Sequence, residues 1–311
     1  MEPSFPTARP TGRGGIMAYS PSQLAALSRL FSATVYREMA AKGRSPTFSR
    51  LISQTGLLER QFVGPTVADA FDAAFAMLRR AGSRDEYVYR SALTHNILLG
   101  KHSLNSAAML TEFRAGTCKA DLVILNGTAT VYEIKSERDS LARLENQIRH
   151  YRRVFAKIFV IAAEAHVQSV LDATPANVGV LSLVRWDRIS TVREAVETVD
   201  EVCPVTIFES LRTAEACQIL KKLGVAPAEV PNTQLHSALR TQFEALNPAD
   251  THREMVSTLK RTRNLSPLNA LVDRLPPSLQ PAALSIQVRR ADHERLVRAV
   301  STPFTDALSW G

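Results

Sequence analysis

The first hundred residues repeat hydrophobic side chains at the spacing of α-helices. After Pro21, leucine, phenylalanine and valine recur every three or four residues, which predicts a helix with one hydrophobic face. Ser20 before Pro21 is typical of a helix start, and Gly43 is typical of a helix end. The same spacing predicts two further helices over about residues 67–81 and 84–99.

Further along the chain the pattern changes to that of β-strands. Hydrophobic or alternating runs cover about residues 107–113, 119–125 and 128–134, and Asn126-Gly127 lies between the last two. Asn-Gly between two such runs is a strong signal for a β-hairpin. We therefore expect the last two strands to pair with each other.

A helix, two more strands and a short helix are expected after the hairpin. The pattern predicts a helix over about 141–156, a strand over 158–162, a short helix over 166–171 and a strand over 178–184. From about Thr191 onward only helical patterns remain. This order is typical of an α/β domain in which a crossover helix returns to a mixed sheet.

We therefore expect an α/β fold with a mixed central sheet flanked by helices, a helical N-terminal segment and a helical C-terminal accessory domain. The expected divisions are a disordered tail at 1–19, a helical segment at 20–83, the α/β domain at 84–190 and the accessory domain at 191–311.

Composition and charge narrow the class of protein only a little. The chain has 311 residues, 45% hydrophobic and 22% charged, which excludes a collagen-like or wholly disordered protein. Its 38 Lys and Arg against 30 Asp and Glu give a net charge of +8. Residues 1–50 carry seven basic and two acidic side chains, residues 251–311 carry nine and five, and the middle is nearly neutral. The excess permits a polyanionic partner without indicating where it binds.

The cysteines and the hydrophobic runs indicate a cytoplasmic protein. Three cysteines, Cys118, Cys203 and Cys217, are an odd number without paired spacing, which fits a reducing compartment. No hydrophobic run approaches the ~20 residues of a membrane helix. No signal-like hydrophobic segment follows the N-terminal arginines. We expect no membrane partner.

Candidate chemistry lies on the two strands of the hairpin. Asp121 is on the first strand, and Glu133 and Lys135 lie two apart on the second, which places them on one face. Two carboxylates held close together repel, so they either share a proton or bind a cation. Mg²⁺ or Mn²⁺ with oxygen ligands suits such a pair, and the carbonyl of Ile134 is a further available ligand. Lys135 beside such a metal is suited to orient or deprotonate an attacking water.

This constellation resembles the active-site motif of the PD-(D/E)XK nuclease superfamily. Asp121 followed by Glu133-x-Lys135 matches the superfamily's carboxylates and lysine. Gln147 and Tyr151 on the next helix look like the Gln-x-x-x-Tyr motif of its RecB-like branch. The run from residue 132 to 155 also resembles a little-characterised group of bacterial proteins known mostly from genomes and mobile elements.

The resemblance covers roughly residues 84–185 and departs from the pattern at Ala120, where a Pro would precede the Asp. It implies a restriction-endonuclease-like core and a Mg²⁺- or Mn²⁺-dependent nuclease that hydrolyses phosphodiester bonds, in DNA rather than RNA. It also implies a role in phage defence or mobile-element biology.

The resemblance assigns a role to each candidate residue. Asp121 and Glu133 would bind the metal, with Ile134 and an additional acidic ligand, Glu86. Lys135 would position the attacking water. Gln147 would hold Lys135 or the substrate in place.

The same residues also have ordinary explanations. Glu133 and Lys135 fit a cross-strand pair on a solvated face, and Asp121 fits the start of a strand. Glu86 in the first turn of a helix is favoured by the helix dipole without any metal, and Glu112 competes with it as the additional ligand. Gln147 fits an exposed helix position.

The predicted helix at 141–156 is rich in arginine. Its arginines suit sequence-independent contacts with a nucleic-acid backbone, although such a face is also typical of a solvated helix: Arg143, Arg149, Arg152 and Arg153.

A catalytically inactive module on the same fold, which binds nucleic acid or serves as a regulatory interaction protein, is the alternative to a nuclease. The C-terminal helical domain would then contact a second copy of the chain or a partner protein. Within it, Thr213–Gly224 followed by another helix faintly resembles a helix-turn-helix, although the glycine turn is generic.

Overall fold

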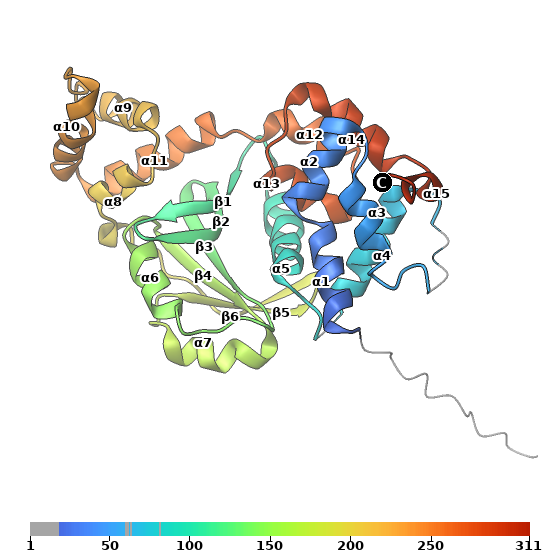
Figure 1. Ribbon diagram of the computed structural model, residues 1–311. Coiled ribbons are helices and arrows are strands. Elements are labelled where there is room, and N and C mark those ends of the chain that lie inside the picture. Colours follow the sequence, from blue (N-terminus) through green and yellow to red (C-terminus); the bar gives the residue numbers. More distant parts are fainter. Residues whose placement is uncertain (1–18, 60–61, 63, 81) are drawn as a thin grey trace, which may run out of the picture.

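The computed structural model describes residues 19–59, 62, 64–80 and 82–311. It shows a twisted sheet with helices packed on both faces (Figure 1). Of the disordered tail predicted at 1–19, all but Tyr19 lies outside the described residues.

The sheet has six strands in the order in which they follow along the chain. The strands are β1 (Ala108–Ala115), β2 (Cys118–Asn126), β3 (Thr128–Lys135), β4 (Lys157–Ala162), β5 (Gly179–Arg185) and β6 (Arg188–Arg193). The pairs β1–β2, β2–β3 and β5–β6 are antiparallel, whereas β3–β4 and β4–β5 are parallel. The expected α/β fold with a mixed sheet flanked by helices is confirmed.

Local sequence explains most of this sheet. The predicted hairpin forms, and Gly127 in its turn has a φ of 75°, a left-handed conformation that glycine adopts without strain. Strand β6 was not predicted, because none of its residues is buried at this edge of the sheet and polar residues separate Ile189 from Val192.

Helices from both ends of the chain cover one face of the sheet (Figure 1). From the N-terminal part these are α1 (Pro21–Leu30), α2 (Ala33–Lys42), α3 (Pro46–Ile52), α4 (Val67–Leu78) and α5 (Glu86–Leu93). From the C-terminal part they are α12 (Asn269–Val272), α13 (Gln280–Ser285), α14 (His293–Val300) and α15 (Phe304–Ala307). Arg295 of α14 donates to the carbonyl oxygen of Ala40 at 3.2 Å and to that of Ala41 at 2.8 Å, and so caps α2.

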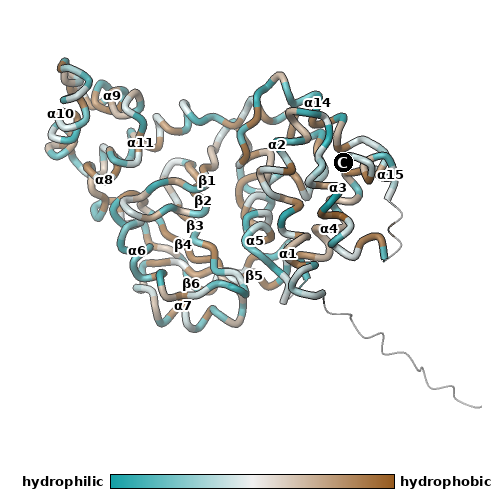
Figure 2. Tube along the Cα trace, viewed as in Figure 1, coloured by the Kyte–Doolittle hydropathy of each residue, from teal (hydrophilic) through white to brown (hydrophobic). Residues whose placement is uncertain are grey.

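A second group of helices covers the opposite face. It consists of α6 (Leu144–Arg152), α7 (Val167–Ala173), α8 (Pro204–Glu209), α9 (Thr213–Lys222), α10 (Asn232–Glu244) and α11 (Pro248–Thr262). Alternate strand residues serve the two cores: Leu122 and Tyr132 belong to the first, and Val123 and Val131 to the second. Figure 2 shows hydrophobic and hydrophilic positions alternating along the helices on both sides of the sheet.

The C-terminal helices are thus distributed over both faces, and the division expected at residue 190 stays a prediction. None of the described helices is long and apolar enough to cross a membrane. The cytoplasmic location and the expected contact of the C-terminal helices with a second copy or a partner also stay predictions.

A buried ion pair fixes the end of α11 to α9. Glu215 is 2% exposed, and Arg263 donates to its two carboxylate oxygens from Nε and Nη2, both at 2.9 Å. The hydroxyl of Thr262 donates to the same carboxylate at 3.0 Å. The guanidinium of Arg263 also lies 5.2 Å from the ring centroid of Phe113 on β1. This residue therefore joins α9, α11 and the sheet.

We expect Arg263→Ala to lower the free energy of unfolding by about 3 kcal/mol, because it leaves the buried Glu215 without its counter-charge. Arg253→Ala is the matched control, since Arg253 is exposed and pairs with exposed Asp250, and should cost less than about 1 kcal/mol. Urea denaturation of both variants measures the difference. Equal losses would show that the Glu215–Arg263 pair has no special role.

Candidate functional site

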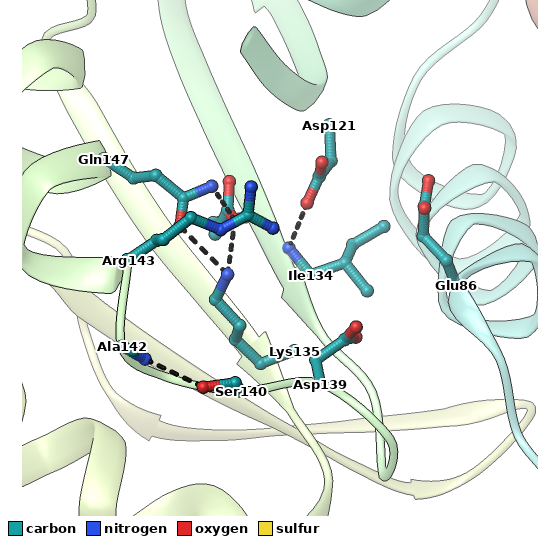
Figure 3. Close-up of a pocket in the computed structure, with 10 residues that line it drawn as sticks. Glu86, Asp121, Ile134, Lys135, Asp139, Ser140, Ala142, Arg143 and Gln147 are labelled. Carbon is teal, nitrogen blue, oxygen red and sulfur yellow. Dashed lines mark hydrogen bonds and ion pairs between the residues drawn. The ribbon is translucent and has the colours of Figure 1, made fainter. Parts of the chain in front are cut away.

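A polar pocket of about 210 Å³ lies between α5, the end of β3 and the start of α6 (Figure 3). All six residues predicted as metal-binding or catalytic line it: Glu86, Asp121, Glu133, Ile134, Lys135 and Gln147. Arg143, predicted to contact nucleic acid, lines it as well. Sequence patterns alone therefore located this pocket, whatever its residues do.

The hairpin explains how the two strands deliver their carboxylates. The recorded β2–β3 pairing runs from Asn126 and Thr128 to Leu122 and Tyr132 and does not extend to Asp121. Asp121 therefore lies where the two strands separate, which leaves room for side chains between them.

Glu133 is enclosed by hydrogen-bond donors. It is 1% exposed, and its Oε1 accepts from Lys135 Nζ at 2.7 Å and from Gln147 Nε2 at 2.5 Å. Its Oε2 accepts from the hydroxyl of Tyr151 at 2.7 Å. Lys135 Nζ also donates to Gln147 Oε1 at 3.0 Å. Both carboxylate oxygens are thus engaged by the protein, and the charge of Lys135 is neutralised.

Asp121 has a different environment, although it lies nearby. One of its oxygens accepts from the backbone N–H of Ile134 at 2.8 Å. Burial, followed by the neighbouring charge of Glu133, raises the pKa of Asp121 to about 8. Ile134 thus contributes its amide here, and the role of its carbonyl as a metal ligand stays a prediction.

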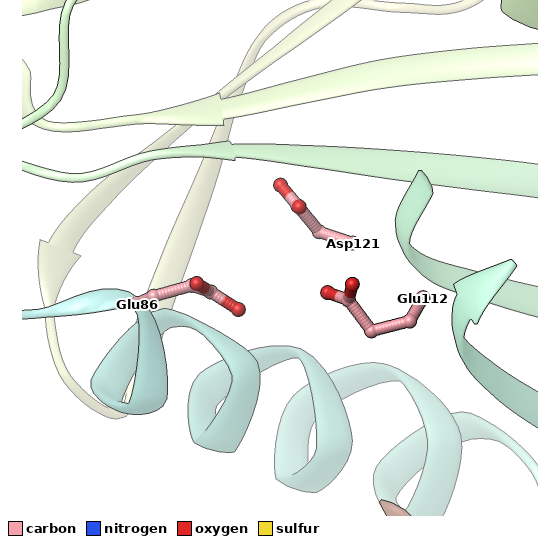
Figure 4. A group of neighbouring side chains, drawn as sticks. All are labelled: Glu86, Glu112 and Asp121. Carbon is pink, nitrogen blue, oxygen red and sulfur yellow. The ribbon is translucent and has the colours of Figure 1, made fainter. Parts of the chain in front are cut away.

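Three carboxylates, from Glu86, Glu112 and Asp121, gather at the outer side of the pocket (Figure 4). Each offers an oxygen, and these atoms lie within 4.8 Å of one another. Glu86 begins α5, and Glu112 interrupts the β1–β2 pairing with a φ of 53°. The sequence offered Glu86 and Glu112 as competing ligands, whereas the structure brings both to Asp121 and leaves Glu133 outside the group.

The four arginines of α6 and its ends fall into two pairs. Arg152 donates to Asn177 and lies 3.6 Å from a carboxylate oxygen of Glu201, and Arg153 donates to the sulfur of Cys203 at 3.5 Å. Arg143 and Arg149 are exposed, and neither forms an ion pair within the described part of the chain. Only the second pair is available to an external partner without breaking an internal contact.

We expect Tyr151→Phe to lower the free energy of unfolding by about 1–3 kcal/mol, because the buried Oε2 of Glu133 then loses its donor. Tyr36→Phe is the control: the Tyr36 hydroxyl is buried and has no hydrogen-bond partner among the described residues, so its loss should be nearly neutral. Thermal or urea denaturation distinguishes the two. A neutral Tyr151→Phe would mean that Glu133 does not depend on this network.

Comparisons with known proteins point to a phage family. The family model described as Bacteriophage P4 protein cII matches residues 79–275. Protein cII of Enterobacteria phage P4 is 31% identical over 184 residues, which span 57% of this chain and 67% of that protein. No solved structure matches this chain.

This match corrects the interpretation drawn from the motifs. The predicted membership of the PD-(D/E)XK nuclease superfamily is wrong, because the matched region includes the whole segment on which it rested, residues 84–185, and belongs to another family. The expected Mg²⁺- or Mn²⁺-dependent nuclease, a hydrolase of phosphodiester bonds, is withdrawn with it, as is the link to phage defence. In the structure Glu133 and Lys135 bind each other, where the nuclease interpretation needed one for a metal and the other for a water. The chain belongs to the phage P4 protein cII family.

Proposed function

We propose that this chain is a non-catalytic regulatory protein that binds nucleic acid, with DNA as the expected form, along α6 from the rim of the pocket at Arg143 to Arg149. One contrast carries the proposal. Glu133 and Lys135 neutralise each other inside the pocket, whereas Arg143, which lines the pocket, and Arg149, farther along α6, are exposed and lack an ion pair in the region that the structure describes. The interior maintains the shape of the site, and the rim offers charge to a partner.

The sheet supports this proposal as a scaffold. An antiparallel hairpin that continues into parallel β3, β4 and β5 is the arrangement expected of a restriction-endonuclease-like core. We propose that such a core is used here for binding without hydrolysis. Helix α6 lies against this core through Leu144, Ile148 and Tyr151, which fixes the arginines on its outer side.

Binding through these arginines is expected to depend on salt and to be independent of sequence. Guanidinium groups contact phosphate oxygens, and each phosphate that is neutralised releases counterions. We expect the double variant Arg143→Ala/Arg149→Ala to bind a mixed-sequence DNA duplex about tenfold more weakly, with a salt slope reduced by about two. Fluorescence anisotropy over a series of salt concentrations measures both quantities.

The matched control is Arg185→Ala/Arg188→Ala, which removes two exposed arginines at the β5–β6 end of the sheet. It should bind as the wild type does. Equal losses in both double variants would contradict the proposed rim. Divalent-metal-dependent degradation of the DNA that disappears in Lys135→Ala would contradict the proposal that the protein is non-catalytic.

We also propose that Glu86, Glu112 and Asp121 bind Mg²⁺, or Mn²⁺ in its place. The donor set fits, because hard divalent ions prefer carboxylate oxygens and these three converge. Burial and then the neighbouring charge of Glu133 raise the pKa of Asp121, and a cation beside Asp121 would offset both effects. When bound, the ion supplies a positive charge that attracts a phosphate group beside Arg143.

Mg²⁺ should raise the melting temperature of the wild type, and EDTA should reverse the shift. At a hundredfold excess over the dissociation constant the gain is about 2.7 kcal/mol. Glu112→Gln and Asp121→Asn should each abolish most of the shift, whereas Glu164→Gln, an exposed carboxylate next to β4, should retain it. A shift that persists in Asp121→Asn would exclude this site.

A further inference from the structure

We infer that a surface formed by α9 and α11 is a second contact for the phosphate backbone of duplex nucleic acid. The surface, called the α9–α11 surface below, consists of Gln218, Lys221, Lys222, Ser257 and Arg261. The inference rests on the proposed function in taking nucleic acid as the partner. Its residues lie outside the pocket and outside α6.

Two hydrogen bonds place these residues on one surface. Arg261 Nη2 donates to Gln218 Oε1 at 2.7 Å, and Lys222 Nζ donates to Ser257 Oγ at 2.8 Å. Gln218 and Lys222 are four residues apart on α9, and their partners Arg261 and Ser257 are four residues apart on α11 in the opposite direction. One turn forward on one helix and one turn back on the other is the geometry of antiparallel neighbours.

The support beneath this surface is firmly packed. On α9, Ala216, Ile219 and Leu220 are buried in the second hydrophobic core, and Glu215 is held by Arg263. Gln218, Lys221 and Lys222 are not among the buried residues of the helix and point away from this core. The side chains that a partner would meet are mounted on a rigid element, so little backbone ordering is needed on binding.

The charge on this surface is positive. Lys221 and Arg261 are exposed and form no ion pair within the described part of the chain. Lys222 lies 3.3 Å from a carboxylate oxygen of Glu254, which offsets one charge. The dipoles of α9 and α11 favour cations near their C-terminal ends, so the presence of cations there is not informative by itself. What is informative is that cations from two different helices converge on one surface.

The hydrogen-bonding groups of the α9–α11 surface indicate which chemical groups a partner must offer. Lysine and arginine only donate, and Gln218 has its carbonyl oxygen occupied by Arg261, so its amide presents N–H groups. A surface of donors complements a partner of acceptors. Phosphate oxygens, which accept and never donate in the nucleic-acid backbone, fit this requirement, and contacts of this kind carry no base sequence information.

The proposed contact with a duplex does not depend on a helix-turn-helix. Nine residues, 223–231, separate α9 from α10, too many for the turn of a helix-turn-helix. Gly224, which suggested the turn in the sequence, instead ends α9 with a φ of 76°. The duplex is favoured by its phosphates, because double-stranded DNA carries one negative charge per about 1.7 Å of its axis.

The test is the binding of a mixed-sequence DNA duplex by the full chain that carries Lys221→Ala/Arg261→Ala. We expect affinity to fall about tenfold and the salt slope to fall by about two. Lys221→Arg keeps a phosphate-binding cation and should bind as the wild type does. The matched control, Arg240→Ala/Arg253→Ala, removes two cations of the same helical group that are paired with acidic residues, and it should leave affinity unchanged. Thermal melting verifies that each variant is folded.

Three outcomes separate this inference from the proposed function. Loss of affinity in Lys221→Ala/Arg261→Ala, with Arg143→Ala/Arg149→Ala unaffected, supports the α9–α11 surface and overturns the pocket rim. The reverse result overturns the α9–α11 surface and leaves the proposed function standing. A wild-type chain that does not bind the duplex at low salt overturns both.

Discussion

The organisation of the site depends on how Glu133 is satisfied. A carboxylate that is 1% exposed would be very costly without partners, and here three side chains donate to it from β3 and α6. These bonds fix α6 against the sheet at the point where Arg143 begins that helix. The same bonds neutralise Lys135, so the interior of the pocket presents little net charge and the neighbouring Asp121 and the rim determine what it attracts.

Two carboxylates a short distance apart therefore have opposite roles. Glu133 is surrounded by donors and holds the structure together, whereas Asp121 receives one backbone N–H and carries a raised pKa because of burial and the nearby negative charge. The donors around Glu133 hold the pocket together, whereas the oxygens of Asp121 are less fully bonded within the chain.

Short-range sequence patterns predicted most of the sheet and the residues of the pocket. They did not predict contacts between segments that are far apart in the sequence. Asn126-Gly127 and the alternation around it were sufficient for the hairpin, and the spacing of Glu133, Lys135 and Gln147 was sufficient to gather them. No local signal showed that Glu112 would join Glu86, because their meeting depends on how β1 packs near α5. The motif of Glu133, Lys135 and Gln147 also led to a wrong prediction. The same residue types at the same spacing are compatible with a buried hydrogen-bonded ion pair as well as with a nuclease site.

The packing of α14 on α2 has a consequence for how the chain becomes folded during synthesis. Leu122 and Tyr132 face a core that needs residues beyond 270, such as Leu296 and Ala299, in addition to the first helices. A ribosome releases the hairpin and α2 long before it releases α14, so one apolar face of the sheet stays partly uncovered until α14 has been synthesised. The N-terminal helices therefore complete their core only when α14 is available, and a chain truncated before α14 would expose an apolar surface that favours aggregation.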